Sequence, residues 1–388
     1  MRLLPPVAAA ALALTLVSAP TQAGQPVPDA RVSVTKADRA KVPGLKVKKL
    51  VKGLDLVWDV RPLTRNKIIF TQRNRATIST FAKGKVKRIK GFPSNKIWVS
   101  GETGLLGLYV DPDDNHRIYT CQGWKSETEG PDVRVIAWTL DDKFRHVTMD
   151  RTLVKGFPTS SGRHGGCRIL IDGEGSMIVG TGDAAQGTNP RNLDSLGGKT
   201  LRLDRFTGKP WPANVYSGAK TNRRYMHTFG HRNVQGLALR KDGSVFSMEH
   251  GPDRDDEVNL LVNGKDYGWN PVPGYNEAVP MTDQGLPGDQ VPAKWSSGYP
   301  TVATSGGTFL YGNEWGAFDG ALAVACLKAS RVLFLTFDSS GTFLRKRVPP
   351  ALTKYGRLRT VTQLPNGDLL VTTSNGGGHD VILRVRPS

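Results

Sequence analysis

The 388-residue sequence contains only three cysteines, Cys121, Cys167 and Cys326. So few cysteines exclude a fold held together by many disulfides, and their spacing fits no cysteine-rich metal motif. A cysteine without a partner is usually buried in a folded protein. We therefore predict one disulfide and one buried thiol, although the spacing does not show which two cysteines pair.

Long apolar runs are equally scarce. The single clear one, Val7–Val17, lies between the basic Arg2 and the small-residue site Thr21-Gln22-Ala23. This order is typical of a secretory signal peptide, and no other stretch approaches the roughly 18 apolar residues that a membrane-spanning helix requires. We therefore expect residues 1–23 to be a signal peptide, no membrane span in the mature chain, and a secreted protein in an extracellular, periplasmic or cell-surface location.

Acidic residues are few relative to basic ones: 34 Asp and Glu stand against 53 Lys and Arg, a formal net charge of +19. A nucleic-acid-binding module would combine basic with aromatic residues in one groove. Here the basic residues are scattered, apart from a patch at Lys41–Lys52 with little aromatic content. The composition argues against a nucleic-acid partner and fits a basic secreted surface, with adhesion to an anionic cell-wall polymer as a compatible alternative.

The sequence also lacks long amphipathic helix patterns between its candidate strands, which disfavours a doubly wound α/β fold. It is instead rich in turn formers, with 44 Gly and 25 Pro. One theme recurs six times: a short apolar strand, a turn with Asn, Asp or Gly, and a second short strand. The six candidate hairpins pair Val57–Pro62 with Lys67–Thr71, Leu105–Val110 with Arg117–Cys121, Arg168–Ile171 with Met177–Gly180, Val234–Leu239 with Val245–Met248, Gly307–Leu310 with Ala321–Ala325, and Thr360–Leu364 with Asp368–Thr373.

The fourth hairpin has the strongest signal, because Asp242-Gly243 lies between two apolar runs. Repeated hairpins, with further candidate strands at Val133–Leu140 and Arg331–Asp338, are typical of a propeller. We predict an all-β fold, a six-bladed β-propeller of four-stranded antiparallel blades, over residues 46–388. Residues 24–45, which are polar and contain three prolines, are expected to form a flexible N-terminal arm.

The open ends of these hairpins collect charged and polar residues. Residues that precede the first strand and follow the second meet at the end away from the turn, and radially packed blades place all such ends on one face. That face is where a propeller holds a ligand. The residues expected there are Glu102, Arg163, His164, Asp183, Arg232, Asn233, Gly251, Pro252, Arg357 and Arg359.

Three features of this face suggest chemistry, and each has a structural alternative. His164 lies near glycines that let a ligand approach a neutral imidazole base, although a lone loop histidine is more often a surface residue. Arg357 and Arg359 are expected on one face of a strand, where they either hold a polycarboxylate or form a solvated edge. Asp255-Asp256-Glu257 either supplies oxygen ligands to a hard cation or forms only a turn.

Seven short motifs follow one another along the chain: Gly104-Leu105-Leu106-Gly107, His164-Gly165-Gly166-Cys167-Arg168, Gly182-Asp183, Gly230-His231-Arg232-Asn233, Glu249-His250-Gly251-Pro252, Asp256-Glu257-Val258-Asn259 and Tyr267-Gly268-Trp269. Taken in this order, they resemble the soluble pyrroloquinoline-quinone (PQQ) glucose/sorbosone dehydrogenase family, and its aldose sugar dehydrogenase branch most. The resemblance extends from about Gly53 to Arg386 and implies a six-bladed propeller that uses PQQ and calcium.

The resemblance also implies roles for the site residues. His164 takes the position of the base that removes the proton from the sugar hydroxyl, and Arg232 and Asn233 polarise the quinone oxygens. Glu102 stands where the family usually has Gln, so its carboxylate beside an anionic cofactor requires a nearby cation. The other residues implied to hold the cofactor or line its pocket are Tyr299, Thr301, Lys328, Arg357 and Arg359.

Two calcium sites are implied in the same way. The carbonyls of Gly251 and Pro252 correspond to ligands of the calcium that PQQ also chelates. Glu257 and the carbonyl of Tyr267 resemble a second, structural site.

The sequence therefore predicts a secreted quinoprotein oxidoreductase that oxidises the anomeric hydroxyl of an aldose-type sugar by hydride transfer to PQQ, with calcium. The expected partners are a small-molecule sugar and an electron acceptor; neither the acceptor nor an oligomeric state is indicated. The alternative is a propeller without turnover that binds carbohydrate or an anionic cell-wall polymer, against which the presence of His164 and the arginine pair argues. A calcium-dependent propeller hydrolase would need a metal held by several carboxylates, whereas the open ends offer mostly cations.

Overall fold

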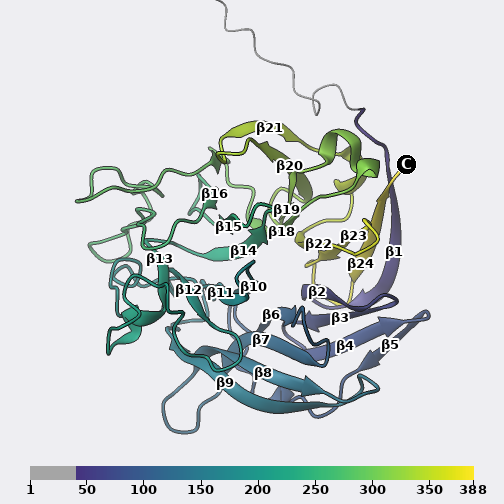
Figure 1. The fold of residues 1–388 in the computed structure, drawn as a ribbon, viewed down its shortest axis with the longest axis horizontal. Coiled ribbons are helices and arrows are strands. Elements are labelled where there is room, and N and C mark those ends of the chain that lie inside the picture. The colour runs from purple at the N-terminus through teal and green to yellow at the C-terminus, as the bar shows by residue number, and fades with distance from the viewer. Residues whose placement is uncertain (1–40) are drawn as a thin grey trace, which may run out of the picture.

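Six four-stranded antiparallel sheets are arranged around one axis, as Figure 1 shows. This computed structural model describes residues 41–388, so the predicted signal peptide 1–23 and residues 24–40 of the predicted arm lie outside the described residues. The sheets are the blades of a β-propeller. This confirms the predicted fold class, the number of blades and the number of strands in each.

Five blades follow the chain outward from an inner strand beside the axis to an outer strand at the rim. The first contains β2 (Val57–Thr64), β3 (Lys67–Gln72), β4 (Thr77–Ala82) and β5 (Lys85–Arg88), and the second β6 (Leu105–Val110), β7 (Arg117–Trp124), β8 (Asp132–Leu140) and β9 (Val147–Phe157). The third contains β10 (Arg168–Ile171), β11 (Ser176–Gly180), β12 (Lys199–Asp204) and β13 (Met226–Phe229), and the fourth β14 (Val234–Leu239), β15 (Val245–Glu249), β16 (Glu257–Leu260) and β17 (Trp295–Ser296). The fifth contains β18 (Thr304–Phe309), β19 (Leu322–Cys326), β20 (Arg331–Phe337) and β21 (Phe343–Arg347).

The sixth blade is built from both ends of the described chain. Its inner strands are β22 (Leu358–Gln363), β23 (Leu369–Thr373) and β24 (Asp380–Pro387), and its outer strand is β1 (Leu45–Leu54). β1 runs antiparallel to β24, with Leu45 opposite Pro387 and Leu54 opposite Asp380. The hydrogen bonds of this pair close the ring between the first and the last strand. No strand was predicted at residues 45–54, because the partner of β1 lies at the opposite end of the chain.

All six predicted hairpins are present, and each forms the two innermost strands of a blade. The predicted strands at Val133–Leu140 and Arg331–Asp338 correspond to β8 and β20. In the β14–β15 turn, the backbone N–H of Arg240 donates to the Ser244 carbonyl at 2.8 Å, and Asp242 Oδ1 accepts the Ser244 N–H at 3.0 Å. The local turn chemistry therefore sets the positions of the strand ends that carry the site.

Apolar side chains fill the space between neighbouring blades. Between the second and third blades, for example, Leu106 and Tyr119 belong to one buried cluster with Ile169 and Met177. Helical structure within residues 41–388 is confined to four short 3-10 segments, η1 (Ser94–Lys96), η2 (Asn222–Tyr225), η3 (Asn313–Phe318) and η4 (Pro350–Leu352). No helix in this part of the chain has the length and apolar character that a membrane crossing requires.

The cysteines confirm the prediction of one bridge and one buried thiol. Cys121 pairs with Cys167, and Cys326 is free and buried. The bridge joins β7 of the second blade to the residue just before β10 of the third.

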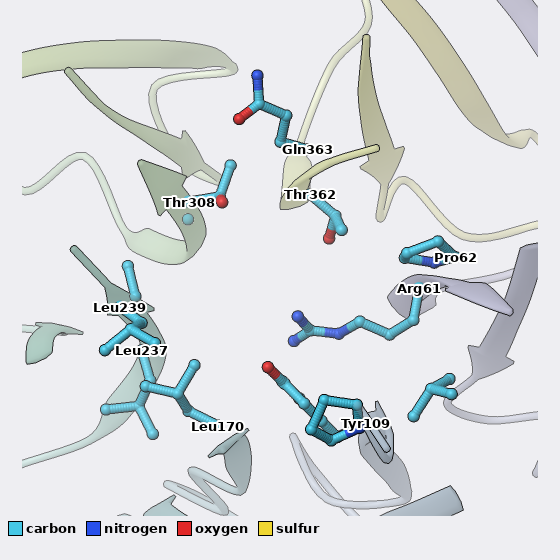
Figure 2. A pocket seen from close by; sticks show the side chains of 13 residues that line it. Arg61, Pro62, Tyr109, Leu170, Leu237, Leu239, Thr308, Thr362 and Gln363 are labelled. Carbon is cyan, nitrogen blue, oxygen red and sulfur yellow. The ribbon is translucent and has the colours of Figure 1, made fainter. Parts of the chain in front are cut away.

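The two openings of the central channel differ in chemistry. A cavity of about 260 Å³ lies where the inner strands end, and Figure 2 shows the guanidinium of Arg61 and the hydroxyl of Tyr109 facing Leu237 across it. None of the predicted site residues lines this cavity. They lie instead where the inner strands begin, at the other opening.

Candidate active site

A histidine–carboxylate pair lies at the beginning of the third blade. His164 precedes β10 and Asp183 follows β11, so the hairpin brings them to one end, where His164 Nδ1 is 2.8 Å from Asp183 Oδ1. His164 is 3 % exposed and Asp183 is fully buried. The two loops approach closely because residue 182 is glycine: a Cβ on Gly182 would lie 1.9 Å from the His164 carbonyl oxygen.

The Asp183 carboxylate accepts three further hydrogen bonds, one of them from the Ala185 backbone N–H to Oδ1 at 2.8 Å. Trp269 Nε1 donates to Asp183 Oδ2 at 2.9 Å and the Tyr275 hydroxyl donates to the same oxygen at 2.8 Å. An ionised carboxylate only accepts hydrogen bonds, so the His164 Nδ1 that faces Asp183 carries a proton and Nε2 of the neutral ring does not. Within residues 41–388 nothing hydrogen-bonds to Nε2. The arrangement therefore prepares His164 Nε2 to accept a proton.

Glu102 connects this histidine to the fourth blade. Its Oε2 accepts the His164 backbone N–H at 3.2 Å and the Asn233 side-chain N–H at 3.3 Å. Burial opposes ionisation of Glu102, but the neighbouring His164, His250 and Arg359, together with the backbone N–H of His164, hold the pKa of this carboxyl below its ordinary value, and Arg359 is the guanidinium among them. The cation that sequence analysis required beside Glu102 is therefore present.

Arg232 lies beside the same network, buried and 5.7 Å above the ring of Trp269. Its Nη2 donates to Glu277 at 2.5 Å and its Nη1 to the His250 carbonyl at 3.2 Å. Glu277 also accepts from Arg163 at 2.7 Å, and these hydrogen bonds outweigh burial and lower the pKa of Glu277. Arg232 Nε is buried without a partner among the described residues, so it remains available to a ligand oxygen.

The two predicted carboxylate-binding arginines differ in environment. Arg359 lies in β22 and is buried, whereas Arg357 precedes β22 and is exposed. Arg359 Nη1 donates to Gln235 at 2.8 Å, but its Nε has no partner in the described chain. Burial, and then the charges of Arg73 and other arginines, lower the pKa of Arg359 to about 9. A buried guanidinium without a carboxylate partner favours an anionic ligand.

Lys328 and Thr301 also meet at this opening. Lys328 Nζ donates to Thr301 Oγ1 at 3.0 Å, and Thr301 is buried while Lys328 is exposed. Tyr299 is 79 % exposed, so its ring faces solvent and contributes to the pocket only at its mouth.

The backbone at Gly251 and Pro252 is suited to a hard cation. Neither carbonyl accepts a hydrogen bond from the described residues. Residue 251 has to be glycine, because a Cβ there would lie 1.9 Å from the Arg254 carbonyl oxygen. Asp256 is not available as a ligand, since its carboxylate accepts the N–H groups of Gly251, Val302 and Ala303 at 2.5–2.9 Å.

Glu257 lies in a second cluster of oxygen atoms. It is directly opposite Glu249 in the β15–β16 ladder, and Asn259 Nδ2 donates to both carboxylates. Burial, and then the charge of Glu249, raise the pKa of Glu257 to about 8. The Thr282 hydroxyl donates to Glu257, and Thr282 lies in a loop that contacts the backbone beside Tyr267. The backbone carbonyl of Tyr267 accepts no hydrogen bond from the described residues.

The residues present therefore fit both implied groups. Unpartnered buried nitrogens on Arg232 and Arg359 suit an anionic cofactor, and free backbone carbonyls suit calcium. Among residues 41–388, no three or more His, Cys, Asp or Glu side chains cluster so as to hold a metal, and a calcium ion here would depend on those carbonyls.

A family model described as glucose/sorbosone dehydrogenase matches residues 54–384 of this sequence. The chain belongs to the glucose/sorbosone dehydrogenase family. The resemblance in the seven motifs is thereby confirmed, and the match covers the propeller from the end of β1 into β24.

Individual members of the family are similar over most of the chain. Aldose sugar dehydrogenase YliI of Escherichia coli (strain K12) is 28 % identical over 315 residues, which cover 79 % of this chain and 82 % of that protein. The PQQ-bound form of aldose sugar dehydrogenase from Streptomyces coelicolor has a TM-score of 0.74 and 27 % identity, covering 89 % of this chain and 100 % of that one. An oxidoreductase of Thermus thermophilus, described as a glucose dehydrogenase, is 31 % identical with a TM-score of 0.75, covering 88 % of this chain and 100 % of that one.

Sequence reasoning missed three residues of this family site. Tyr275 and Glu277 lie in the long loop before β17, and Arg73 follows β3 and donates to the Glu102 carbonyl at 3.4 Å. Asp183 was expected at the open end but was given no role. The loop between β16 and β17 carries no strand pattern, so only its position beside His164 reveals these contacts.

The disulfide is expected to stabilise the loop that carries His164. The bridge joins cysteines 46 residues apart, so its loss in Cys121→Ala/Cys167→Ala should cost about 4 kcal/mol of unfolding free energy. Cys167 has a φ of +79°, a conformation that favours glycine. Cys121→Ala/Cys167→Gly should therefore be about 1 kcal/mol more stable than the double alanine variant. Denaturant unfolding of the three proteins tests this, and equal stability of wild type and double alanine variant would contradict it.

Proposed function

We propose that this protein is a secreted, PQQ- and calcium-dependent dehydrogenase that oxidises the anomeric hydroxyl of an aldose-type sugar. The observation that carries the proposal is the His164–Asp183 pair, with Nε2 free, beside the unpartnered buried guanidiniums of Arg232 and Arg359. Relatives named as aldose sugar dehydrogenases, one of them PQQ-bound, support it. The proposed location outside the cytoplasm is supported by the signal-peptide pattern of residues 1–23.

Arg232 and Arg359 would hold PQQ, which when bound would supply the hydride acceptor for the anomeric carbon of the sugar. His164 Nε2 accepts the proton of the sugar hydroxyl. Asp183 keeps Nδ1 protonated and stabilises the imidazolium that forms, and the donors from Trp269 and Tyr275 hold Asp183 in place. A base that is already oriented needs no rearrangement when the proton moves.

Arg232 and Arg359 act by binding. Their buried Nε groups would donate to cofactor oxygens, and Lys328 and Arg357 would add positive charge at the mouth of the pocket. The carbonyls of Gly251 and Pro252 would hold calcium beside them. A propeller that only binds carbohydrate or polymer would have no need for a carboxylate-oriented histidine with a free Nε2.

Dye-linked oxidation of an aldose panel by the purified protein tests the proposal. Dye reduction is expected only when PQQ and Ca²⁺ are both present. If PQQ does not bind at micromolar concentration with calcium, or if no aldose is oxidised when both are bound, the proposed function is wrong.

Calcium is also expected to stabilise the fold. An ion that binds only the folded state adds about 2.7 kcal/mol at a concentration 100 times its Kd. The melting temperature of metal-stripped protein should therefore rise when calcium is added, and EGTA should abolish activity. Glu257→Gln should lose part of this gain, whereas the control Glu127→Gln, at a side chain that is 81 % exposed, should keep all of it. A melting temperature that does not respond to calcium would show both proposed calcium sites to be wrong.

A further inference from the structure

Positive charge is concentrated in one segment of the chain. Residues 41–90 contain 15 Lys and Arg but only two acidic residues, Asp55 and Asp59, and so carry +13 of the total +19, whereas residues 91–388 carry only +4. Asp59 is buried and pairs with Arg61 and Arg168 inside the channel. It therefore does not neutralise the surface.

The fold gathers these cations at the rim. β1 is the outermost strand of the sixth blade and β5 that of the neighbouring first blade, as Figure 1 shows. Lys46 and Lys48 are two residues apart on β1, as Lys85 and Lys87 are on β5, and all four are exposed. Alternate residues of a strand point to one side at a spacing of roughly 6.7 Å. Each strand therefore presents a short row of ammonium groups.

A groove of about 910 Å³ lies between the sixth and the first blade. Its lining includes Leu50 of β1, the β2–β3 turn and the end of β4. The cations of the groove are Arg65, Lys67, Lys83 and Arg384, and its apolar residues are Leu50, Ile68, Phe81, Leu364, Pro365 and Leu370. Arg384 already pairs with Asp368, which leaves the first three for a ligand.

The exposed lysines of this region lack counter-ions among the described residues. No ion pair within the described chain involves Lys46, Lys48, Lys49, Lys52, Lys83, Lys85 or Lys87. The pKa of Lys67 is lowered, first by burial and then by the positive charges of Arg145 and Lys87. The positive potential therefore extends from the strand rows into the groove.

The composition of this surface distinguishes between kinds of partner. The large hydrophobic side chains exposed between residues 41 and 90 are Val42 and Val86 alone, and the one aromatic ring that lines the groove, Phe81, is half-buried. A protein partner would be expected to contact aromatic anchors, and single-stranded nucleic acid would stack its bases on aromatic rings. Rows of flexible lysines without such anchors suit a linear chain of phosphates, which is recognised by charge alone.

We propose that the basic face, defined as Lys46, Lys48, Lys49, Lys52, Arg65, Lys83, Lys85 and Lys87, binds a linear phosphate-bearing polymer that lies along β1 and in the groove beside it. Binding and sugar oxidation occupy different parts of the molecule, because this face is at the rim and the His164 site is at the channel opening. The proposal therefore does not rest on the proposed function.

Fluorescence anisotropy with labelled linear inorganic polyphosphate, over a series of salt concentrations, tests the proposal. The logarithm of the association constant should fall linearly with the logarithm of the salt concentration, with a slope of about 0.7 for each phosphate contacted. Replacing four lysines of β1 together, in K46Q/K48Q/K49Q/K52Q, should weaken binding at least about 10-fold and reduce the slope by about 3. K83Q/K85Q/K87Q provides a second variant on the first blade.

The matched control removes the same charge elsewhere. K209Q/K220Q/K241Q/K265Q changes four exposed lysines of the third and fourth blades and should bind polyphosphate within about twofold of wild type. Equal weakening by control and β1 variants would mean that only net charge matters and would overturn the proposal. No binding of polyphosphate at low salt would also overturn it, as would β1-dependent binding of an acidic protein in its place. Sugar oxidation should be unchanged in all three variants.

Discussion

Replacement of His164 by glutamine is expected to lower kcat for aldose oxidation by about 10³- to 10⁴-fold and to leave PQQ affinity nearly unchanged. Glutamine can still donate a hydrogen bond to Asp183, but it has no nitrogen that accepts a proton at neutral pH. The loss therefore falls on proton removal and not on cofactor holding. Dye-linked kinetics at saturating PQQ, with calorimetric titration of PQQ, measure the two effects separately.

Two variants around His164 serve as controls. In Asp183→Asn the side-chain amide can donate to His164 Nδ1, so Nδ1 need not carry the proton and Nε2 is no longer kept free to accept one. This variant should lower kcat by about 10² or more with PQQ affinity intact. Tyr275→Phe removes one donor to Asp183 but leaves the Asp183–His164 contact, so its effect should be much smaller. Because His164 is buried, the melting temperature of each variant has to match that of wild type. If His164→Gln retains more than about a tenth of kcat/KM, the assignment of the base is wrong.

Replacement of Arg359 by leucine is expected to weaken PQQ binding by roughly 2 to 5 kcal/mol, the usual cost of removing one partner of a buried charge pair. This corresponds to roughly 30-fold to several thousand-fold in Kd. Burial disfavours the charge of Arg359 in the free protein and lowers its pKa to about 9. Leucine should therefore leave the stability of cofactor-free protein unchanged or increase it. If Arg359 only stabilised the fold, Arg359→Leu would instead lower the melting temperature and leave PQQ affinity unchanged.

Arg357→Leu is the matched control, since Arg357 is exposed and solvent screens its charge. We expect it to weaken PQQ binding by at most about 1 kcal/mol. High PQQ should restore most of the turnover of Arg359→Leu, because the loss lies in cofactor holding, whereas His164→Gln should show no rescue. Glu102→Gln should tighten PQQ binding or leave it unchanged, because it removes a carboxylate beside an anionic ligand. Equal losses for both arginine variants would mean that the difference in burial has no effect on cofactor binding.

The propeller was predicted from short-range sequence patterns. Each hairpin combines apolar strands with a turn that contains Asn, Asp or Gly, as at Asp242-Gly243, and such turns form from a few adjacent residues. The same regularity placed His164, Arg232 and Arg359 at strand ends on one opening. The family motifs then assigned their roles. The burial of individual side chains was less predictable. Arg357 and Arg359 are separated by one residue, yet Arg357 is exposed and Arg359 is buried, and the strand has a bulge between Leu358 and Thr360.

The hairpins, the six blades and the residues at their open ends were predictable from the amino-acid sequence, because turn chemistry and alternating apolar patterns are local. Which distant segments meet became known from the three-dimensional fold. It paired β1 with β24, joined Cys121 to Cys167, and brought Tyr275 from the loop before β17 against His164 and Asp183. Each of these contacts joins residues far apart in the chain, and closing such loops is favourable only once the apolar faces of the blades have packed.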